Sequence, residues 1–464
     1  MRPVFVYSGG MKKIRATCVA LLGVLCALTF VTPMSTRASS DVQIGVQAIT
    51  ASLMGVEVAS LPSATGKRIV DAGAVWLRRN ALLWSSVEPI EGARNWAAVA
   101  ALENDLHVAA QRRFNTILIV RSAPTWAQAR AGSACGPVRA DKLAAFGTFM
   151  RAAVARYSKP PFGTLYFEIG NEPDVDTAVV QGDSVFGCWG NSADPNYGGG
   201  YYAEALKAVY PKMKAANPRA QVLVGGLLLD CDPSAPPAGR NCIESRFLEG
   251  ILRAGGGAFF DAVSFHAYDF YSQTEGSYAN PNWGSAWNTT GPAVIRKAKF
   301  LRDTLAQFGV NKPILATELG LICWQCATTP PEFERTKVNY MPQIYAVAKA
   351  INLRAGIWFS WEGWFGSGLV TGVGGPTPAL TAYQVASTNL GRASFVRERT
   401  DVTGARVYEF MRSGRRLWVM WPADGTTHTI TLPAVPLRMF NAVGTPVKPT
   451  ASILLGAPVY VEWR

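Results

Sequence analysis

The 464-residue chain is poor in charged residues and histidine, and it has no long apolar run. Charged side chains make up 17% of the residues, and there are three histidines. Lys and Arg form no block despite the net charge of +13, so the sequence makes no case for nucleic-acid binding. A membrane-spanning helix needs about 20 consecutive apolar residues, and no run reaches that length. The 49% hydrophobic content and the length exclude a disordered chain, a collagen-like repeat and a small disulfide-stapled scaffold.

The N-terminal segment has the layout of a secretory signal peptide. Lys12, Lys13 and Arg15 precede an apolar run over residues 16–31, and small residues follow at 35–38. A basic start, a short apolar core and a small-x-small exit are typical of such a peptide. We therefore expect residues 1–38 to be removed and the mature protein to be secreted without a membrane span. An uncleaved N-terminal anchor is the alternative.

Six cysteines follow that segment: Cys135, Cys188, Cys231, Cys242, Cys323 and Cys326. An even number in an exported chain predicts disulfides, and six cysteines allow fifteen pairings. Nearness in sequence favours Cys231–Cys242 and Cys323–Cys326, which leaves Cys135–Cys188. Zinc held by the Cys-x-x-Cys at 323–326 is the alternative, but no histidine lies near it. We therefore expect no metal and no cofactor.

Short apolar runs alternate with helix-like stretches over most of the chain. The runs lie near 53–58, 74–78, 116–121, 164–169, 221–225, 261–266, 313–317 and 355–360. Strand followed by helix about eight times predicts an α/β fold, a (β/α)8 TIM barrel over residues 39–385. A doubly wound open sheet also fits, but it would usually carry a Gly-rich phosphate loop after its first strand, which we do not find. The long loops that follow the strands would build a site at the C-terminal face of the barrel.

The pattern changes near residue 386. Short alternating runs separated by Gly, Pro and Asp turns predict a small all-β, sandwich-like domain over 386–464. Its Trp418 and Trp421 fit either a stabilising core or a carbohydrate-binding surface, and the core is the simpler interpretation.

Two predicted barrel strands end in a glutamate. Tyr166-Phe-Glu-Ile-Gly-Asn-Glu-Pro173 places Glu172 at the end of the fourth strand, and Pro313-Ile-Leu-Ala-Thr-Glu-Leu-Gly320 places Glu318 at the end of the seventh. In a closed barrel both carboxyl groups project into the same mouth. Cleavage of a glycosidic bond requires such a pair, one to protonate the leaving oxygen and one to attack the anomeric carbon or activate water. Singly, Glu172 fits a helix N-terminal acid and Glu318 a loop ion pair equally well.

These segments resemble a known family. Ile169-Gly-Asn-Glu-Pro173 and Thr317-Glu318 are similar to motifs of the clan A glycoside hydrolases, the retaining (β/α)8 enzymes, and most of all to family 39 or a family 5 relative. Other matching segments are Arg78-Arg79, Trp84-Ser-Ser-Val-Glu-Pro89, Ala123-Pro-Thr-Trp126, Phe265-His-Ala-Tyr268 and Trp358-Phe-Ser-Trp361. The resemblance covers about residues 50–370. It implies a retaining glycoside hydrolase acting on β-linked oligo- or polysaccharides, with Glu172 as general acid/base and Glu318 as nucleophile.

The resemblance also implies supporting roles around the two glutamates. Asn171 would hydrogen-bond the sugar 2-hydroxyl, and His266 or Tyr268 would lie beside the nucleophile. An arginine that ends the second strand would keep Glu318 ionised, and the spacing to Trp84 leads us to prefer Arg79 over Arg78.

Aromatic residues are the other expected contacts of a sugar. Trp361 would form the platform under the sugar at the cleavage position, and Trp126 would line an outer subsite. Trp324 and Trp364 fit outer subsites or loop packing equally well. A transglycosylase on the same residues and a catalytically silent carbohydrate-binding barrel are the alternative functions.

Overall fold

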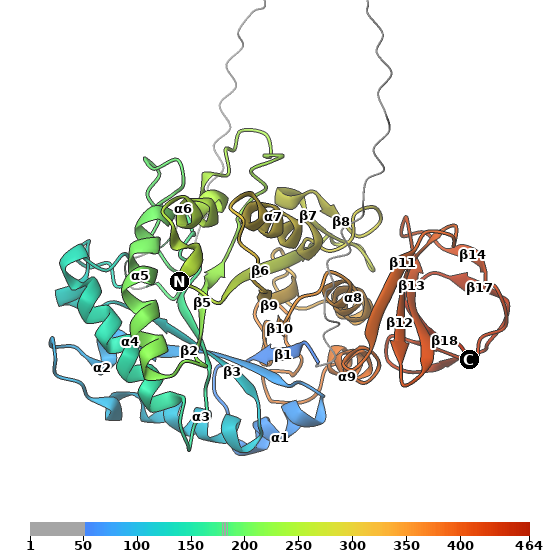
Figure 1. Cartoon of the computed structure of the whole chain (residues 1–464). Helices are drawn as coiled ribbons and strands as arrows, with labels where there is room; N and C mark the ends of the chain where they lie inside the picture. Colours follow the sequence, from blue (N-terminus) through green and yellow to red (C-terminus); the bar gives the residue numbers. More distant parts are fainter. Residues whose placement is uncertain (1–51, 179, 181, 183) are drawn as a thin grey trace, which may run out of the picture. The chain divides into compact units, whose positions relative to one another are not determined.

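The structure is a computed structural model that describes residues 52–464 except 179, 181 and 183 (Figure 1). The expected signal peptide over residues 1–38 lies outside the described residues, as do residues 39–51 of the expected barrel range. Within the described part of the chain, no helix combines the length and the apolar character needed to span a bilayer.

A closed barrel of eight parallel strands forms the larger part of residues 52–464. The strands are β1 (Met54–Glu57), β2 (Trp76–Leu83), β3 (Asn115–Arg121), β4 (Tyr166–Asn171), β5 (Gln221–Leu227), β6 (Ala262–Tyr271), β9 (Ile314–Ile322) and β10 (Gly356–Trp358). They pair in the order β5-β4-β3-β2-β1-β10-β9-β6, and the pairing of β5 with β6 closes the ring. Each apolar run of the sequence is one of these strands, which confirms the predicted (β/α)8 barrel.

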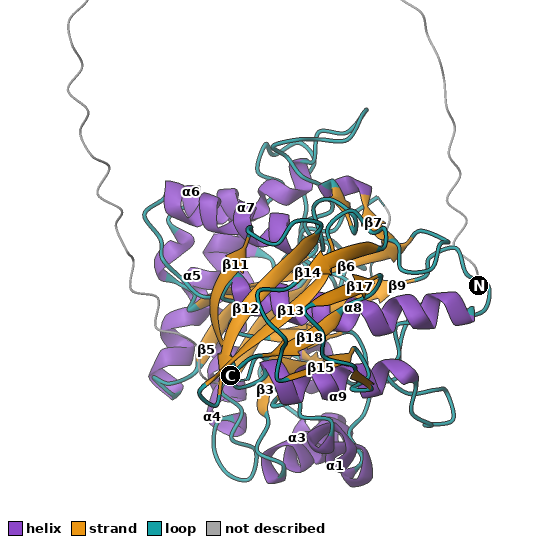
Figure 2. Ribbon diagram, turned by 90° about the vertical axis from the view of Figure 1, so that its right-hand side faces the viewer, coloured by secondary structure: helices purple, strands orange, loops and turns teal. Residues whose placement is uncertain are grey.

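Helices connect successive strands and cover the outside of the barrel (Figure 2). They are α1 (Ser63–Asp71), α2 (Trp84–Val87), α3 (Ala100–Gln111), α4 (Leu143–Tyr157), α5 (Gly199–Ala216), α6 (Phe247–Arg253), α7 (Val294–Gln307), α8 (Pro331–Ala350) and α9 (Pro378–Leu390). Helix α5 shows why the helices pack against the barrel. Apolar residues recur on one of its faces and are buried, namely Tyr202, Leu206, Val209 and Met213. A hairpin of β7 (Tyr278–Asn280) and β8 (Ser285–Ala286) extends β6 in the long loop before α7.

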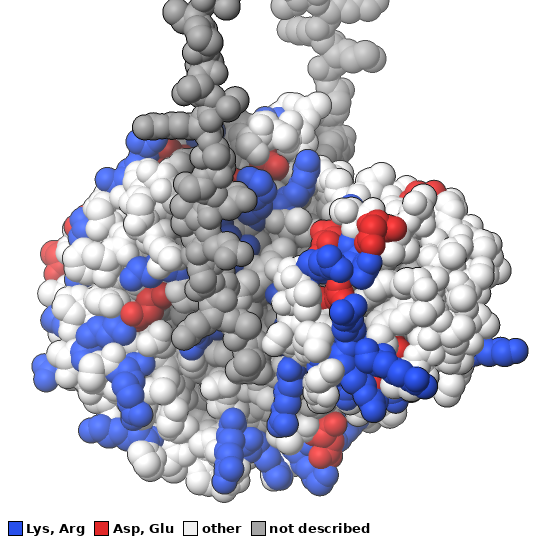
Figure 3. All heavy atoms as spheres, turned by 45° about the vertical axis from the view of Figure 1, so that its right-hand side comes forward, with Lys and Arg blue, Asp and Glu red and all other residues white. Residues whose placement is uncertain are grey.

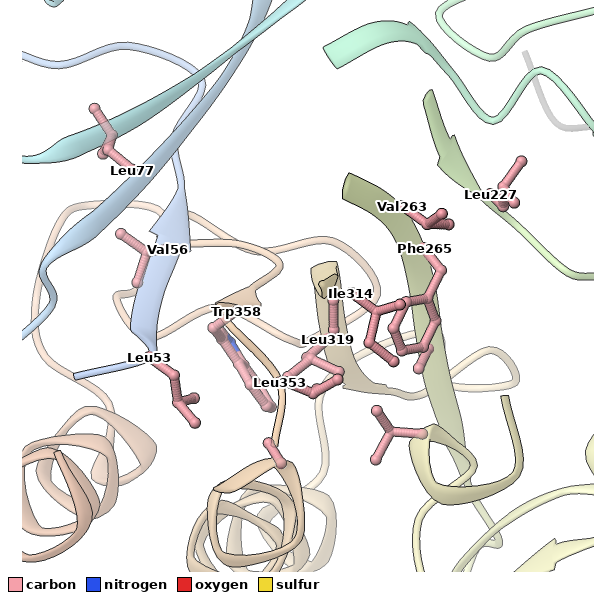
Figure 4. Close-up of a cluster of buried hydrophobic side chains, with 14 of the residues drawn as sticks. Leu53, Val56, Leu77, Leu227, Val263, Phe265, Ile314, Leu319, Leu353 and Trp358 are labelled. Carbon is pink, nitrogen blue, oxygen red and sulfur yellow. The ribbon is translucent and has the colours of Figure 1, made fainter. Parts of the chain in front are cut away.

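Alternation along the strands sorts side chains between the helices and the barrel interior. Leu118 and Val120 of β3 face the helices in the main hydrophobic cluster, whereas Ile117 lies in a separate cluster inside the barrel. Figure 4 shows part of the main cluster, with side chains from β1, β2, β5, β6, β9 and β10.

The barrel interior is layered. An apolar layer near the start of the strands contains Trp76, Ile117, Leu223, Ala262, Leu315, Ala355 and Ile357. Two residues farther along their strands, Arg78, Ser264 and Thr317 are polar and buried. The polar layer therefore lies between an apolar plug and the mouth at the C-terminal ends of the strands.

The C-terminal region is all-β, as the sequence predicted. Strands β11 (Ser394–Arg399), β12 (Ala405–Arg412), β13 (Arg415–Pro422), β18 (Val459–Glu462), β15 (Arg438–Asn441) and β16 (Pro446–Val447) form an antiparallel sheet in that order, and β14 (His428–Thr431) pairs with β17 (Ser452–Leu455). Since α9 ends at Leu390, the change to strands falls a few residues after 386.

The two C-terminal sheets enclose a small core of their own. Trp418 and Met420 of β13 pack with Ile430 of β14 and Leu455 of β17, whereas Trp421 belongs to the core that includes the barrel helices. Trp418 is 2% exposed and Trp421 is 1% exposed. Both tryptophans therefore serve as core residues, in agreement with the simpler interpretation.

Positively charged side chains predominate on the face of the molecule that Figure 3 draws. Figure 3 shows Lys and Arg side chains distributed over the visible face, where they outnumber Asp and Glu.

Three disulfides join the cysteines in the pairs expected from their spacing. They are Cys135–Cys188, Cys231–Cys242 and Cys323–Cys326, with Cα–Cα distances of 5.2, 5.3 and 5.3 Å. Each lies in loops that follow barrel strands, namely those after β3 and β4, after β5, and after β9. The disulfides therefore fix loops at the C-terminal face of the barrel.

Replacing Cys135 and Cys188 together by serine is expected to lower the free energy of unfolding by about 4 kcal/mol, because the bond joins residues 53 apart and restricts the unfolded chain. The matched control replaces Cys231 and Cys242, which are 11 residues apart, and the same reasoning gives a loss of about 3 kcal/mol. Urea unfolding followed by tryptophan fluorescence measures both losses. A larger loss for the shorter loop would contradict this account.

Candidate active site

The guanidinium of Arg78 is buried inside the barrel between three carboxylates. Its Nε donates to Glu168 of β4 at 2.9 Å, and its Nη1 donates to both Glu57 of β1 and Glu318 of β9. Arg78 and Glu168 are fully buried, and Glu57 and Glu318 are 7% and 5% exposed. The surrounding carboxylates hold the pKa of Arg78 well above its usual value, so this arginine carries a permanent positive charge inside the barrel.

Glu168 has a structural role. Besides the Arg78 guanidinium, its carboxylate accepts hydrogen bonds from Ser264 Oγ at 2.6 Å and Thr317 Oγ1 at 2.9 Å. A buried carboxylate that accepts hydrogen bonds from three side chains has the partners that its burial requires. Glu168 therefore anchors Arg78 inside the barrel.

The structure corrects the expected position of Arg79. Its guanidinium pairs with Asp105 of α3 at 2.8 Å and donates to the Val58 carbonyl at 3.0 Å. Adjacent residues of a strand point to opposite sides, so only one of the two arginines of β2 can enter the barrel. Trp76 occupies the interior layer, and this parity sends Arg78 inward and Arg79 outward. The arginine that contacts Glu318 is therefore Arg78.

Glu172 and Glu318 come together at the mouth of the barrel. Glu172 directly follows β4 with a φ of +48°, and its amide donates to the Gly226 carbonyl at 2.9 Å. One oxygen of each carboxyl group and a nitrogen of His266 all lie within 4.8 Å of one another. Among the described residues, these three side chains are also the group that could ligate a metal ion.

His266 is a neutral donor to Glu172. Its Nε2 lies 3.2 Å from Nη2 of Arg78, which can only donate, so Nε2 accepts and the proton is on Nδ1. Nδ1 lies 2.6 Å from Oε1 of Glu172 and 3.4 Å from Oε2 of Glu318. Burial and the charges of Arg78 and Lys297 hold the pKa of His266 well below its usual value, which agrees with a neutral ring.

The two carboxyl groups have unequal partners. Burial raises the pKa of Glu318 to about 8, and the hydrogen bonds that Glu318 accepts from Arg78 and from the Tyr268 hydroxyl limit that rise. Glu172 bonds to neutral His266, and burial together with the charge of Glu318 raises its pKa well above the usual value. When one proton is shared by this pair, it therefore rests on Glu172 and leaves Glu318 charged.

Asn171, the last residue of β4, is held by the same arginine. Its Oδ1 accepts from Nη2 of Arg78 at 2.7 Å, and its Nδ2 donates to the Val185 carbonyl at 3.3 Å. The amide is thus fixed in orientation, with its oxygen toward Arg78 and its NH₂ group toward Val185.

A second buried network, which the sequence analysis missed, supports the site from behind. Lys297 of α7 is 3% exposed, and its Nζ donates to the carbonyls of Leu228 at 2.7 Å and His266 at 2.9 Å. Burial lowers the pKa of Lys297 to about 8. Asp174 accepts from the amides of Leu228 and Leu229, and burial raises its pKa to about 6. A sequence signal existed, since Lys297 lies on the apolar stripe of α7.

The aromatic residues expected to bind sugar lie in different surroundings. Trp361 is 2% exposed and carries the Arg68 guanidinium 5.5 Å above its ring, so a sugar can stack on that face only after Arg68 leaves it. Trp126 is half-buried and packs edge-on against Trp84.

Two other rings lie next to Tyr268. The ring centres of Phe359, directly after β10, and of Trp364 are 6.0 and 6.1 Å from that of Tyr268. The sequence left Trp364 open between a subsite and loop packing, and it gave no indication that Phe359 lies beside Tyr268.

Replacing Arg78 by Met is expected to lower the free energy of unfolding at pH 7 by more than about 3 kcal/mol, because three buried carboxylates lose their counter-charge. The loss is expected to shrink in acid, where the carboxylates take up protons. Arg79→Met is the matched control, since it removes a single ion pair with Asp105. Equal losses for the two variants, measured by urea unfolding, would overturn the central role of Arg78.

Comparison with known proteins gives matches by structure. A scan against models of protein families found no match, and a search of curated proteins found none. Among solved structures, the chain is similar to a family 39 glycoside hydrolase from Bacteroides cellulosilyticus WH2, with a TM-score of 0.66, 19% identity, and coverage of 89% of this chain and 81% of the other.

Two further structures match over most of both chains. A family 30 endoxylanase from Clostridium papyrosolvens C71 has a TM-score of 0.58 and 13% identity, covering 90% of this chain and 97% of the other. A conserved exported protein from Bacteroides fragilis has a TM-score of 0.59 and 12% identity, covering 90% and 98%. At these identities the likeness establishes the fold: the chain has the fold of clan A glycoside hydrolases, in agreement with the resemblance read from its motifs.

Proposed function

We propose that the protein is a secreted retaining O-glycosyl hydrolase that cleaves β-linked oligo- or polysaccharides by double displacement. The observation that carries the proposal is the pair of carboxyl groups at the ends of β4 and β9, with oxygens within 4.8 Å and unequal hydrogen-bond partners. Carboxyl groups are about 5–5.5 Å apart in retaining glycosidases and about 6.5–9.5 Å apart in inverting ones. The short separation supports retention.

In the first step, Glu318 attacks the anomeric carbon while Glu172 gives its proton to the leaving oxygen. Arg78 and Tyr268 support this assignment, because both donate to Glu318 and stabilise the charged nucleophile. The products of the step are a glycosyl ester on Glu318 and the released alcohol.

In the second step, the same Glu172 takes a proton from water while the water oxygen attacks the anomeric carbon. The bond between that carbon and Glu318 breaks, which releases the sugar and restores the Glu318 carboxylate and the protonated Glu172. Formation of the ester removes the negative charge of Glu318, and that charge is one cause of the raised pKa of Glu172. The pKa of Glu172 therefore falls once the intermediate has formed, which turns the acid into a base. Asn171, oriented by Arg78, donates to the sugar 2-hydroxyl in both steps.

Secretion is supported by the chemistry of the cysteines. Disulfides persist in oxidising compartments outside the cytosol, and the described residues contain three of them. A basic, apolar N-terminal segment of signal-peptide layout agrees with that route.

Glu172→Gln and Glu318→Gln are each expected to lower kcat/KM on an active aryl β-glycoside by at least about 10³-fold, because each removes one of the two essential groups. The exposed Glu275→Gln, whose carboxylate pairs with Arg335, is the matched control and should keep full activity. A panel of aryl β-glycosides and polysaccharides identifies the sugar, and NMR identifies the first anomer released.

Other results of this experiment would contradict the proposed mechanism or support one of the alternative functions. Release of the inverted anomer would contradict the assignment of Glu318 as nucleophile. Products longer than the substrate would indicate a transglycosylase, and binding without cleavage would indicate a silent barrel.

Lys297→Met is expected to move the basic limb of the kcat/KM pH profile upward by about 0.5 unit or more, because loss of a nearby cation raises the pKa of Glu172 and keeps the acid protonated to higher pH. Lys297→Arg should keep the limb in place. Lys299→Met is the control on the same helix, since Lys299 is exposed and pairs with Asp303. A limb that stays unmoved in Lys297→Met would show that Lys297 acts only on stability.

A further inference from the structure

Three exposed aromatic side chains form one group at the mouth of the barrel. Trp324 lies in the loop after β9, and Trp364 and Phe365 lie in the loop after β10. They are 53%, 38% and 39% exposed, although such rings are usually covered. Their ring centres lie 4.5–5.7 Å apart, so the three form a continuous surface, which we call the aromatic rim.

The aromatic rim is connected to the reaction centre through one ring. The centre of Trp364 is 6.1 Å from that of Tyr268, whose hydroxyl donates to Glu318. The rim therefore begins next to the residue that holds the proposed nucleophile and ends at the exposed Trp324.

The loops that carry the rim are held firmly. The Cys323 amide donates to the Phe365 carbonyl at 2.9 Å, and the Cys323–Cys326 disulfide encloses Trp324. Buried Lys337 of α8 donates to the carbonyls of Gly366 and Gly368, both at 2.8 Å. Rings held in this way lose little freedom when a ligand binds, which favours binding.

The chemistry of the rim fits an uncharged sugar. Flat aromatic faces complement the C–H face of a pyranose ring, and exposed apolar patches of this kind mark binding sites. The loops of the rim also carry neutral amides that can bond hydroxyl groups: Nε2 of Gln273 contacts Sγ of Cys323 at 3.8 Å, and the exposed Gln325 follows Trp324 in the chain.

We propose that the aromatic rim is a subsite for a neutral sugar unit next to the bond that is cleaved, so that the substrate is an uncharged β-linked glycan of several units. The inference rests on the proposed function for the position of the cleaved bond. Glycan contacts on the rim would lower KM or raise kcat for long substrates.

The test uses Trp324→Ala, because Trp324 is the most exposed ring of the rim and the ring contact with Tyr268 is made by Trp364. Trp324→Tyr keeps a flat ring and is expected to rescue binding. Leu454→Ala, at a 77% exposed position of β17, is the control for loss of an exposed apolar side chain.

Binding is measured by calorimetry with pentaoses of β-1,4-linked glucose, xylose and mannose, in a Glu172→Gln background that prevents turnover. At least one pentaose should bind, and Trp324→Ala should weaken it by about tenfold. Leu454→Ala in the same background should bind that pentaose as tightly as Glu172→Gln alone.

Two outcomes overturn the inference. Either no pentaose binds to Glu172→Gln, or adding Trp324→Ala to Glu172→Gln leaves pentaose binding equally tight. The proposed function fails separately. If pentaose binding depends on Trp324 but the wild-type protein hydrolyses no substrate, the sugar subsite is supported and the proposed hydrolase activity is wrong. If the wild-type protein hydrolyses aryl glycosides but pentaose binding does not depend on Trp324, the proposed hydrolase activity is supported and the sugar subsite is wrong.

Discussion

The charge of Arg78 inside the barrel is the constraint on which the rest of the site depends. A buried cation is costly unless it is paired, and Arg78 is paired with carboxylates from β1, β4 and β9. The same guanidinium fixes the Asn171 amide. Because a guanidinium can only donate hydrogen bonds, it also makes Nε2 of His266 an acceptor and leaves the proton on Nδ1. One side chain thereby sets the orientation of the groups on four strands.

From this centre the two glutamates acquire different characters. Glu318 bonds directly to the charged Arg78, whereas Glu172 bonds to the neutral imidazole of His266. The asymmetry needs no difference between the side chains themselves, because two identical carboxyl groups in unlike surroundings can take the different roles that we propose for them. Lys297 completes the arrangement by holding the His266 backbone from α7.

Much of the fold could be predicted because its signals are local. Apolar strand runs, helix-like stretches and cysteine spacing each depend on nearby residues, and Glu172 and Glu318 are identified by the strands that they end. The inward arginine was mispredicted because Arg78 and Arg79 are adjacent, and the strand register alone decides between them. Lys297 and Phe359 were missed because their contacts join elements far apart in sequence, α7 with β6 in one case and β10 with β6 in the other.

The arrangement around Arg78 also bears on how such a site can change in evolution. A lysine offers no planar fork and cannot bond three carboxylates in the same way. Loss of the arginine would leave Glu57, Glu168 and Glu318 uncompensated on three separate strands, and no single second substitution would restore the balance. The histories of β1, β2, β4 and β9 are thus tied together: descendants of this chain keep the whole ionic centre or must rebuild it in several coordinated steps.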